Sequence, residues 1–207
     1  MDLSTKSLLP FKSPITGETK FEAPGIARLK DLTASLGVLH LRGPDSEKMV
    51  VHMHDGRPGQ KALKIGEARP TNAGVLCRLA ADEYLWLLES PEQWEATFAR
   101  LAEAVEGQRG TVSDLTHGYG KLELSGPHAI ALLPRLCGLD FSETGFPNGR
   151  VAQTSVAKVH ATLVHLDERG NPANYLLLVD RSVSVYVWQV MKAILQAFNP
   201  QDEIQTL

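Results

Sequence analysis

An internal repeat limits the fold of this chain more than any other sequence feature. The segment DLTASLGVLHLRGP at 31–44 returns as DLTHGYGKLELSGP at 114–127, so the two copies lie 83 residues apart. Eight of the fourteen positions are identical without a gap, which unrelated segments rarely show. Because self-similarity at a fixed spacing marks a duplicated structural unit, we expect two halves with the same order of elements.

Each copy of the repeat opens with a strand that leads into a helix. Residues 36–42 and 119–125 alternate apolar and polar side chains with the period of a half-buried strand. The Gly-Pro pair that follows predicts a helix over 45–55 in the first half and over 128–137 in the second. Pro134 lies inside the second of these helices and should kink or shorten it.

Each half closes with a hairpin and a second helix. The dense apolar runs YLWLLE at 84–89 and YLLLVD at 175–180 indicate buried strands, which pair as hairpins with the runs just before them. SPEQ at 90–93 is a capping box that opens an amphipathic helix, and Ser182 is predicted to cap the matching helix.

The predicted order is strand, helix, strand, strand, helix, twice over. We therefore predict an α+β fold in which helices cover one face of antiparallel sheets. Residues 31–207 should form a single domain, made of repeats at about 31–110 and 111–198, with pseudo-two-fold character. Residues 1–30 contain three prolines and are predicted to form an extended N-terminal arm, and residues 56–73 a long basic loop.

Composition narrows the classes of function. The 207 residues carry a net charge of −3, so we expect neither a nucleic acid nor an anionic membrane as partner. The apolar runs are too short to span a bilayer, and the N-terminus has no signal-peptide pattern. The two cysteines lie far apart without a CxxC motif, which favours reduced thiols and a cytoplasmic location.

The second copy of the repeat carries a family resemblance. DLTHGYGKLELSGPHAIALL at 114–133 resembles a segment of the glycine-cleavage T-protein superfamily, the folate-linked aminomethyltransferases. The chain is more similar to the gamma subunits of heterotetrameric sarcosine oxidase, through blocks that span nearly its whole length. These blocks lie at 13–14, 37–43, 112–129, 146–154, 157–159 and 175–191.

This resemblance implies a T-protein-like fold and a small subunit without catalytic residues of its own. The complex it implies oxidises sarcosine (N-methylglycine) and passes the one-carbon unit to tetrahydrofolate. Its larger alpha, beta and delta subunits would be the partners of this chain and would carry the flavin and NAD. The resemblance implies no cofactor bound by this chain alone, with tetrahydrofolate as the alternative.

The chain departs from the catalytic aminomethyltransferases at one segment. Those enzymes are longer and carry an Asn and a Gly-Gly-x-x-Asp-Asp segment whose acid attends the folate. The stretch RPTNAGVLCRLAADEYLW at 69–86 has Asn72 and Gly74, but its nearest acidic pair, Asp82-Glu83, falls in a predicted turn. Two alternatives stay open: a stand-alone folate-binding protein or aminomethyltransferase-like enzyme, and a self-associating scaffold that forms a homo-oligomer.

Six polar residues are candidates for a ligand site or a subunit interface. His117 follows the second DLT, and Arg181 precedes the last predicted helix. His117 could instead be a packed histidine with a purely structural role. Arg181 could instead form an ion pair with Asp180. Arg150 could bind a carboxylate of a partner or of a folate tail, or lie exposed in a loop. The same polar run contains Gln153, Thr154 and Lys158. We predict no catalytic residue and no metal site, because no nucleophile or ligand spacing accompanies the histidines.

Overall fold

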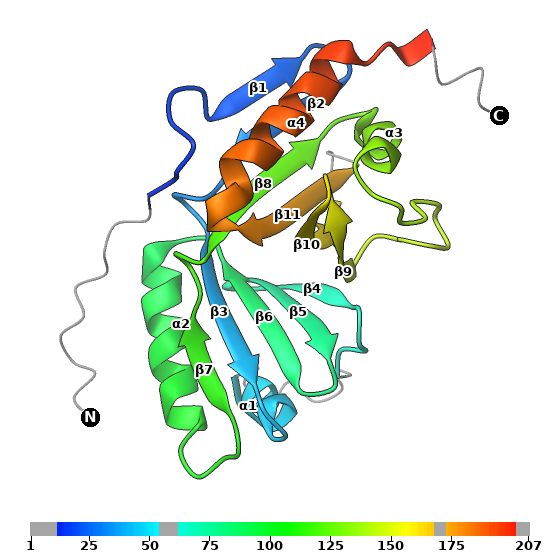
Figure 1. The fold of residues 1–207 in the computed structure, drawn as a ribbon. Helices are drawn as coiled ribbons and strands as arrows, with labels where there is room; N and C mark the ends of the chain where they lie inside the picture. Colours follow the sequence, from blue (N-terminus) through cyan, green and yellow to red (C-terminus); the bar gives the residue numbers. More distant parts are fainter. Residues whose placement is uncertain (1–11, 54–61, 168–172, 202–207) are drawn as a thin grey trace.

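Two antiparallel sheets pack face to face, and each carries helices on its outer side (Figure 1). This computed structural model describes residues 12–53, 62–167 and 173–201. The arrangement confirms the predicted α+β class with antiparallel sheets and helices on one face of each. No helix in the described ranges is long and apolar enough to cross a membrane.

The five-stranded sheet comes from the first half of the chain. Its strands lie in the order β4-β5-β6-β3-β7, with α1 and α2 on the outer face. The elements are β3 (Gly37–Arg42), α1 (Ser46–Met53), β4 (Ala68–Thr71), β5 (Gly74–Ala80), β6 (Glu83–Leu88), α2 (Pro91–Ala104) and β7 (Thr111–Asp114).

The six-stranded sheet combines the second half with a hairpin from the N-terminal region. Its order is β1-β2-β8-β11-β10-β9, with α3 and α4 on the outer face. The elements are β1 (Lys20–Ala23), β2 (Ala27–Asp31), β8 (Tyr119–Ser125), α3 (Ala129–Leu132), η1 (Leu133–Arg135), β9 (Arg150–Val156), β10 (Val159–His165), β11 (Asn174–Asp180), η2 (Arg181–Val183) and α4 (Ser184–Ala197).

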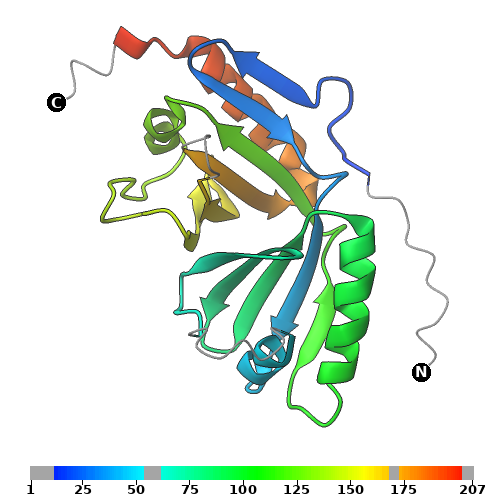
Figure 2. The same ribbon diagram turned by 180° about the vertical axis from the view of Figure 1, so that it is seen from behind.

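The halves exchange their first strands. β2 leads into β3 of the five-stranded sheet but pairs with β8, and β7 leads into β8 but pairs with β3. The register is equivalent in both places, because Asp31 pairs with Leu122 as Asp114 pairs with Leu39. Figures 1 and 2 show the chain passing from one sheet to the other between β2 and β3. This exchange supports the proposal that both repeats form one domain.

Three apolar clusters hold the layers together. One packs α1 and α2 on the five-stranded sheet, and another packs α3 and α4 on the six-stranded sheet. The third lies between the sheets and draws on both: Val38, Ala68, Cys77, Leu85, Leu87, Val151, Val164 and Leu178. Because β6 and β11 are covered on both faces, they are continuous apolar runs instead of alternating ones.

Several local predictions need correction. The helix predicted over 128–137 is α3, which ends at Leu132 and continues as a 3-10 turn; the predicted shortening at Pro134, which lacks the N–H of a regular helix, is confirmed. Ser182 does not cap α4: its backbone N–H donates to Asp180 Oδ1 (2.8 Å), and η2 precedes the helix. The region predicted as an extended arm forms the β1–β2 hairpin from Lys20 onward, and residues 1–11 lie outside the described residues. The predicted loop over 56–73 contains β4, and its residues 56–61 also lie outside them.

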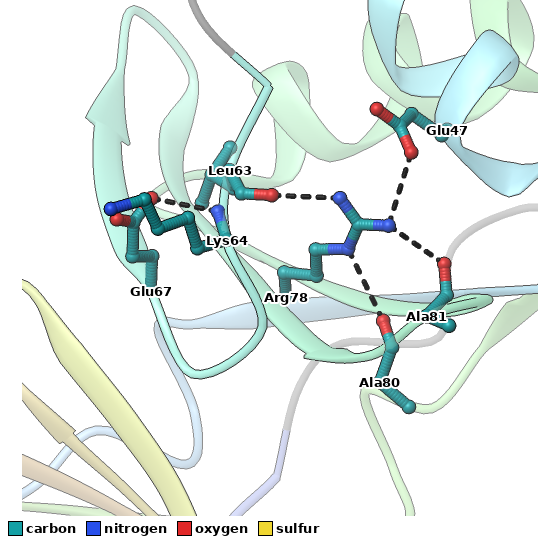
Figure 3. A network of polar contacts seen from close by, with 7 residues as sticks. All are labelled: Glu47, Leu63, Lys64, Glu67, Arg78, Ala80 and Ala81. Atoms are coloured by element: carbon teal, nitrogen blue, oxygen red, sulfur yellow. Dashed lines mark hydrogen bonds and ion pairs between the residues drawn. The ribbon is translucent and has the colours of Figure 1, made fainter.

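Arg78 on β5 ties the segment before β4 to α1 (Figure 3). Its guanidinium donates to the carbonyl of Leu63 (2.7 Å) and to Glu47 Oε2 on α1 (3.0 Å). Two further hydrogen bonds reach the carbonyls of Ala80 and Ala81 at the β5–β6 turn. With these donors occupied and its side chain 13% exposed, Arg78 serves the fold.

Candidate functional site

The two DLT segments form matching turns where the chain passes between the sheets. Asp31 Oδ1 accepts a hydrogen bond from the backbone N–H of Thr33 (2.9 Å), and Asp114 Oδ1 accepts one from Thr116 (2.8 Å). These are Asx turns, in which a short carboxylate side chain bonds the backbone two residues ahead. The Asp and Thr of the repeat are therefore explained by the turn geometry.

The threonine hydroxyls of these turns bind the opposite half. Val38 N–H donates to Thr116 Oγ1 (2.9 Å), and Lys121 N–H donates to Thr33 Oγ1 (3.0 Å). Val38 and Lys121 also accept at their carbonyls, from Leu115 (2.9 Å) and Leu32 (2.8 Å). The crossing is thus held by the same buried hydrogen bonds in both directions, and Val38 and Lys121 occupy equivalent positions.

Lys121 is a buried cation at this crossing. Its side chain is fully buried, and Nζ donates to the carbonyls of Thr116 (2.8 Å) and Thr33 (3.1 Å). The pKa of Lys121 is lowered to about 8, first by burial and then by the positive charge of Arg181, while the carboxylates of Asp114 and Asp31 act in the opposite direction. The lysine satisfies turn carbonyls, and this role needs no ligand.

A backbone contact joins the outer edges of the two sheets, away from the turns that cross between them. Glu67 and Arg150 form an antiparallel bridge beside β4 and β9. Ala68 N–H donates to the Gly149 carbonyl (2.8 Å), and Val151 N–H donates to the Gly66 carbonyl (2.9 Å). The Arg150 guanidinium packs on Gly66, where a Cβ would lie 3.1 Å from Nη2. Arg150 is therefore half-buried at the start of a strand and does not lie in an exposed loop.

A cavity of about 540 Å³ opens between the sheets, beside the first DLT turn. Its walls are largely apolar, and acidic or amide side chains interrupt them. The apolar residues are Leu32, Leu36, Pro70, Val75, Leu87, Leu166 and Leu176, and the polar residues are Ser35, Glu89, Glu123, Asp167 and Asn174. Concave, mostly apolar sites of this size with a few polar groups are typical of small-molecule binding.

The polar groups of the cavity are hydrogen-bond acceptors for the most part. Asp167 Oδ1 already accepts from His165 Nε2 (3.0 Å) and from the Asn174 backbone N–H (3.2 Å). His165 also binds the Phe146 carbonyl through Nδ1 (2.9 Å), so both of its ring nitrogens already have a partner. The side chains of Glu89 and Glu123 have no hydrogen bond or ion pair within the described ranges.

The thiols add no reactive group to this site. Cys77 lies in the cluster between the sheets, where burial raises its pKa to about 12. Burial also raises the pKa of Cys137. Over the described residues, no group of three or more His, Cys, Asp or Glu side chains could hold a metal ion.

The six predicted site residues are distributed over three places. His117 is exposed on the second DLT turn, next to Arg181, whose backbone N–H donates to the Gly118 carbonyl (2.9 Å). Arg150 belongs to the backbone contact between the outer edges of the sheets. The other three lie on the hairpin formed by β9 and β10 at the edge of the six-stranded sheet: Gln153, Thr154 and Lys158. None of the six lines the cavity, and their roles in ligand or partner binding stay predictions.

A family model decides the relationship of the chain. The model of the sarcosine oxidase, gamma subunit family matches residues 61–196, which is well over half of the sequence. The chain belongs to the sarcosine oxidase gamma subunit family. Among curated proteins, no sequence matches this gamma-subunit family member.

Two solved structures share the fold of this gamma-subunit family member. One is a chain of the heterotetrameric sarcosine oxidase from Corynebacterium sp. U-96 in complex with pyrrole 2-carboxylate, with a TM-score of 0.72 and 22% identity over 87% of this chain and 89% of that chain. The other is the glycine cleavage system aminomethyltransferase T from Bartonella henselae, with a TM-score of 0.59 and 19% identity over 82% of this chain. The chain spans 45% of the aminomethyltransferase, and at these identities the likeness shows a common T-protein-like fold.

Sequence reasoning missed the buried lysine and the cavity acids. The alternation in β8 predicted that Lys121 and Glu123 face water, as on a sheet with one solvated face. The repeat contained a signal that could have corrected this, because Val38 stands where Lys121 stands in the other copy. An apolar residue on the supposedly polar face indicates that this gamma-subunit family fold buries both faces.

Proposed function

We propose that this chain is a small, non-catalytic subunit of a cytoplasmic sarcosine oxidase-type complex. The observation that carries the proposal is the family match over residues 61–196. The shared fold over 87% of this chain and 89% of the sarcosine oxidase chain supports it. In this proposal larger alpha, beta and delta subunits bind the flavin and NAD and oxidise the N-methyl group, and this chain contributes to assembly.

The predicted polar residues on β9 suggest where a partner binds. β9 is an edge strand, and edge strands offer unpaired backbone groups to another chain. Its hairpin turn consists of Ala157 and Lys158, both with positive φ, and Tyr186 on α4 donates to the Ala157 carbonyl (3.0 Å). Tyr186 is a large exposed side chain beside this turn, and its neighbour on α4, Val185, is an exposed apolar side chain. We assign the partner surface to this β9–α4 face, which is made of the free edge of β9 and the start of α4, with Thr154 on the α4 side of the strand, Gln153 on its other side and Lys158 in the turn.

Tetrahydrofolate remains the alternative ligand of this chain, and the cavity fits it poorly. Folate has an anionic glutamate tail, which arginine or lysine would bind. In the described residues, the cavity lining contains Glu89, Glu123 and Asp167 and no basic side chain. We therefore assign no folate step to this chain and place the folate chemistry on the larger subunits.

Affinity capture of the tagged full-length chain from its native lysate tests the assembly proposal. We expect yellow material that absorbs in the flavin bands and contains two or three larger chains, identified by mass spectrometry. A colourless protein recovered alone would overturn the proposal. Titration with tetrahydrofolate would then decide between a folate-binding protein and a self-associating scaffold.

A pair of matched variants tests the β9–α4 face. Val185→Glu places a charge on the proposed surface and should reduce the recovered partner chains at least fivefold, because a buried unpaired charge is costly. Val51→Glu on α1 is the control, since Val51 is also exposed but lies on the other sheet's helix layer. Equal recovery with both variants would move the interface elsewhere.

A further inference from the structure

The cavity becomes informative when the equivalent positions of the two halves are compared. Arg42 pairs with Glu83 between β3 and β6, as Ser125 pairs with Asn174 between β8 and β11. Glu123 and Asn174 at the cavity therefore hold the places that His40 and Glu83 hold in the first half. In that half the two side chains close on each other, with His40 Nε2 2.9 Å from Glu83 Oε1.

The second half lacks the close side-chain pair of the first half. Asn174 Oδ1 is buried without a hydrogen-bond partner, and Glu123 is a carboxylate instead of an imidazole. Glu89 adds a second carboxylate to the same cavity. Lys30 is the register partner of Glu123 on β2, but within the described residues no ion pair joins them. Within the described residues the half-buried Glu123 carboxylate has no cationic partner, so a cationic donor in the cavity would pair it.

The walls suit a ligand body that is flat or apolar. Leu36 stands where Tyr119 stands in the other half, and the shorter side chain leaves more room between the sheets. Val75, Leu87 and Leu176 supply apolar surface on either side. The volume of about 540 Å³ lies within the range of small-molecule sites.

We propose that this inter-sheet cavity binds a small organic cation, an alkyl- or arylammonium or an amidinium, with its N–H groups on Glu123 and Glu89 and its apolar body on the leucines. Charge complementarity selects the ligand, because a neutral or anionic molecule of the same shape leaves the carboxylates unpaired. This binding function goes beyond the proposed role in assembly and does not depend on it.

Benzamidinium and its neutral isostere benzamide are the probes for the test. Isothermal titration of the full-length chain should show benzamidinium binding at least tenfold more tightly than benzamide. Glu123→Gln should weaken benzamidinium binding at least fivefold, because it removes the charge and keeps the shape. Glu95→Gln is the matched control: Glu95 is exposed on α2, away from the cavity, and its replacement should leave binding unchanged.

A graft from the other half gives a second, independent variant. The double substitution Glu123→His and Asn174→Glu rebuilds the His40–Glu83 pair in the second half. We expect this variant to retain the wild-type unfolding midpoint and to lose benzamidinium binding at least tenfold. If it unfolds, Glu123→Gln alone decides the question.

Three outcomes would overturn the proposal: no benzamidinium binding by the wild-type chain, equal affinity for benzamide, or unchanged affinity in Glu123→Gln. A fourth concerns the assembled complex. If partner chains exclude benzamidinium from the cavity, the cavity is covered in the complex and the small-ligand proposal fails. Each of these results is separate from the recovery of partner chains, so the assembly proposal can stand when this one falls.

Discussion

The two halves of the chain share a backbone plan and differ in the side chains that face the space between the sheets. Both use an Asx turn and a threonine hydroxyl to bind the other half, at Thr33 and at Thr116. On the strands that follow, Val38 corresponds to Lys121, and His40 corresponds to Glu123. The positions that match serve the crossing of the chain, and the positions that diverge create a buried charge and an open cavity.

This difference teaches how to interpret a duplicated chain. Identical residues in the two copies report what the fold requires twice: here that is a turn and a hydroxyl at each crossing, and a glycine after the strand that follows it. The fold does not require the same residue in both halves at equivalent positions where the copies differ. Glu123 of the cavity is of this second kind, and a comparison of the copies is therefore a better guide to a binding site than the repeat motif itself.

The largest effect should come from the glycines that end the repeat. Gly43 and Gly126 both have φ near +131°, and a Cβ at Gly43 would lie 2.5 Å from the Arg109 carbonyl oxygen. At Gly126 the nearest atom is Ala27 Cα at 2.8 Å. We expect Gly43→Ala to lower the free energy of unfolding by on the order of 4 kcal/mol and Gly126→Ala by roughly 3 kcal/mol, measured by urea denaturation.

Gly138 provides the control for this comparison. It has open space around its Cα, so Gly138→Ala should change the free energy of unfolding by less than about 0.5 kcal/mol. If Gly126→Ala costs more than Gly43→Ala, the close approach of the Arg109 carbonyl oxygen does not determine the cost at Gly43.

Lys121 distinguishes the halves through pH. Its pKa is lowered from 10.5 to about 8 in the folded protein. Below pH 8 the lysine is charged in both states, and the cost of its burial is fully present. As the pH rises from about 8 to about 10.5, the folded state releases the proton first, and above that range the cost is gone. The wild type should therefore gain roughly 3 kcal/mol of stability relative to Lys121→Met between pH 7 and pH 11.

Urea denaturation across this pH range gives the measurement, and Lys30→Met gives the control because Lys30 is exposed. The test compares the free energies of unfolding of the wild type and Lys121→Met at each pH, because tyrosines titrate in the same range and contribute equally to both. A difference that does not change with pH would mean that Lys121 keeps its ordinary pKa in the folded protein.

The hydroxyls of Thr33 and Thr116 should contribute similar amounts to the free energy of unfolding. Thr33→Val leaves the Lys121 N–H buried without a partner, and Thr116→Val does the same to Val38. Each should cost about 2 kcal/mol of stability, while Thr→Ser keeps the hydroxyl and should cost less. Thermal and urea unfolding of the four single variants measures this, and a large cost at one threonine alone would break the equivalence of the crossings.

The sequence predicted the elements of each half better than the way in which the halves combine. Apolar alternation located β3 and β8, and dense apolar runs located β6 and β11. The exchange of β2 and β7 could not be predicted, because the pattern of a strand does not say which sheet it joins. The deciding contacts are long-range: the hydrogen bond from Lys121 to Thr33 spans 88 residues.

The cavity escaped sequence reasoning for a related reason. Its lining comes from seven separate parts of the chain, between Leu32 and Leu176. Glu123 stands at a polar position of β8, which in sequence is an ordinary alternating strand. Only the pairing of β8 with β11 brings Glu123 near Asn174. The predicted polar run at 150–158, in contrast, was visible in sequence because its residues are contiguous, and it formed an edge strand.

The smallest effect concerns the helix starts, where the halves differ in capping. Ser90 Oγ accepts the Gln93 backbone N–H (3.2 Å) at the start of α2, so Ser90→Ala should cost about 1 kcal/mol. Ser182 does not bond the first turn of α4, because its hydroxyl donates to Asp180 at the surface. Ser182→Ala should therefore stay within about 0.5 kcal/mol of the wild type in urea denaturation. Equal losses at both serines would show that α4 depends on Ser182 as a cap and that the halves are more alike than their hydrogen bonds indicate.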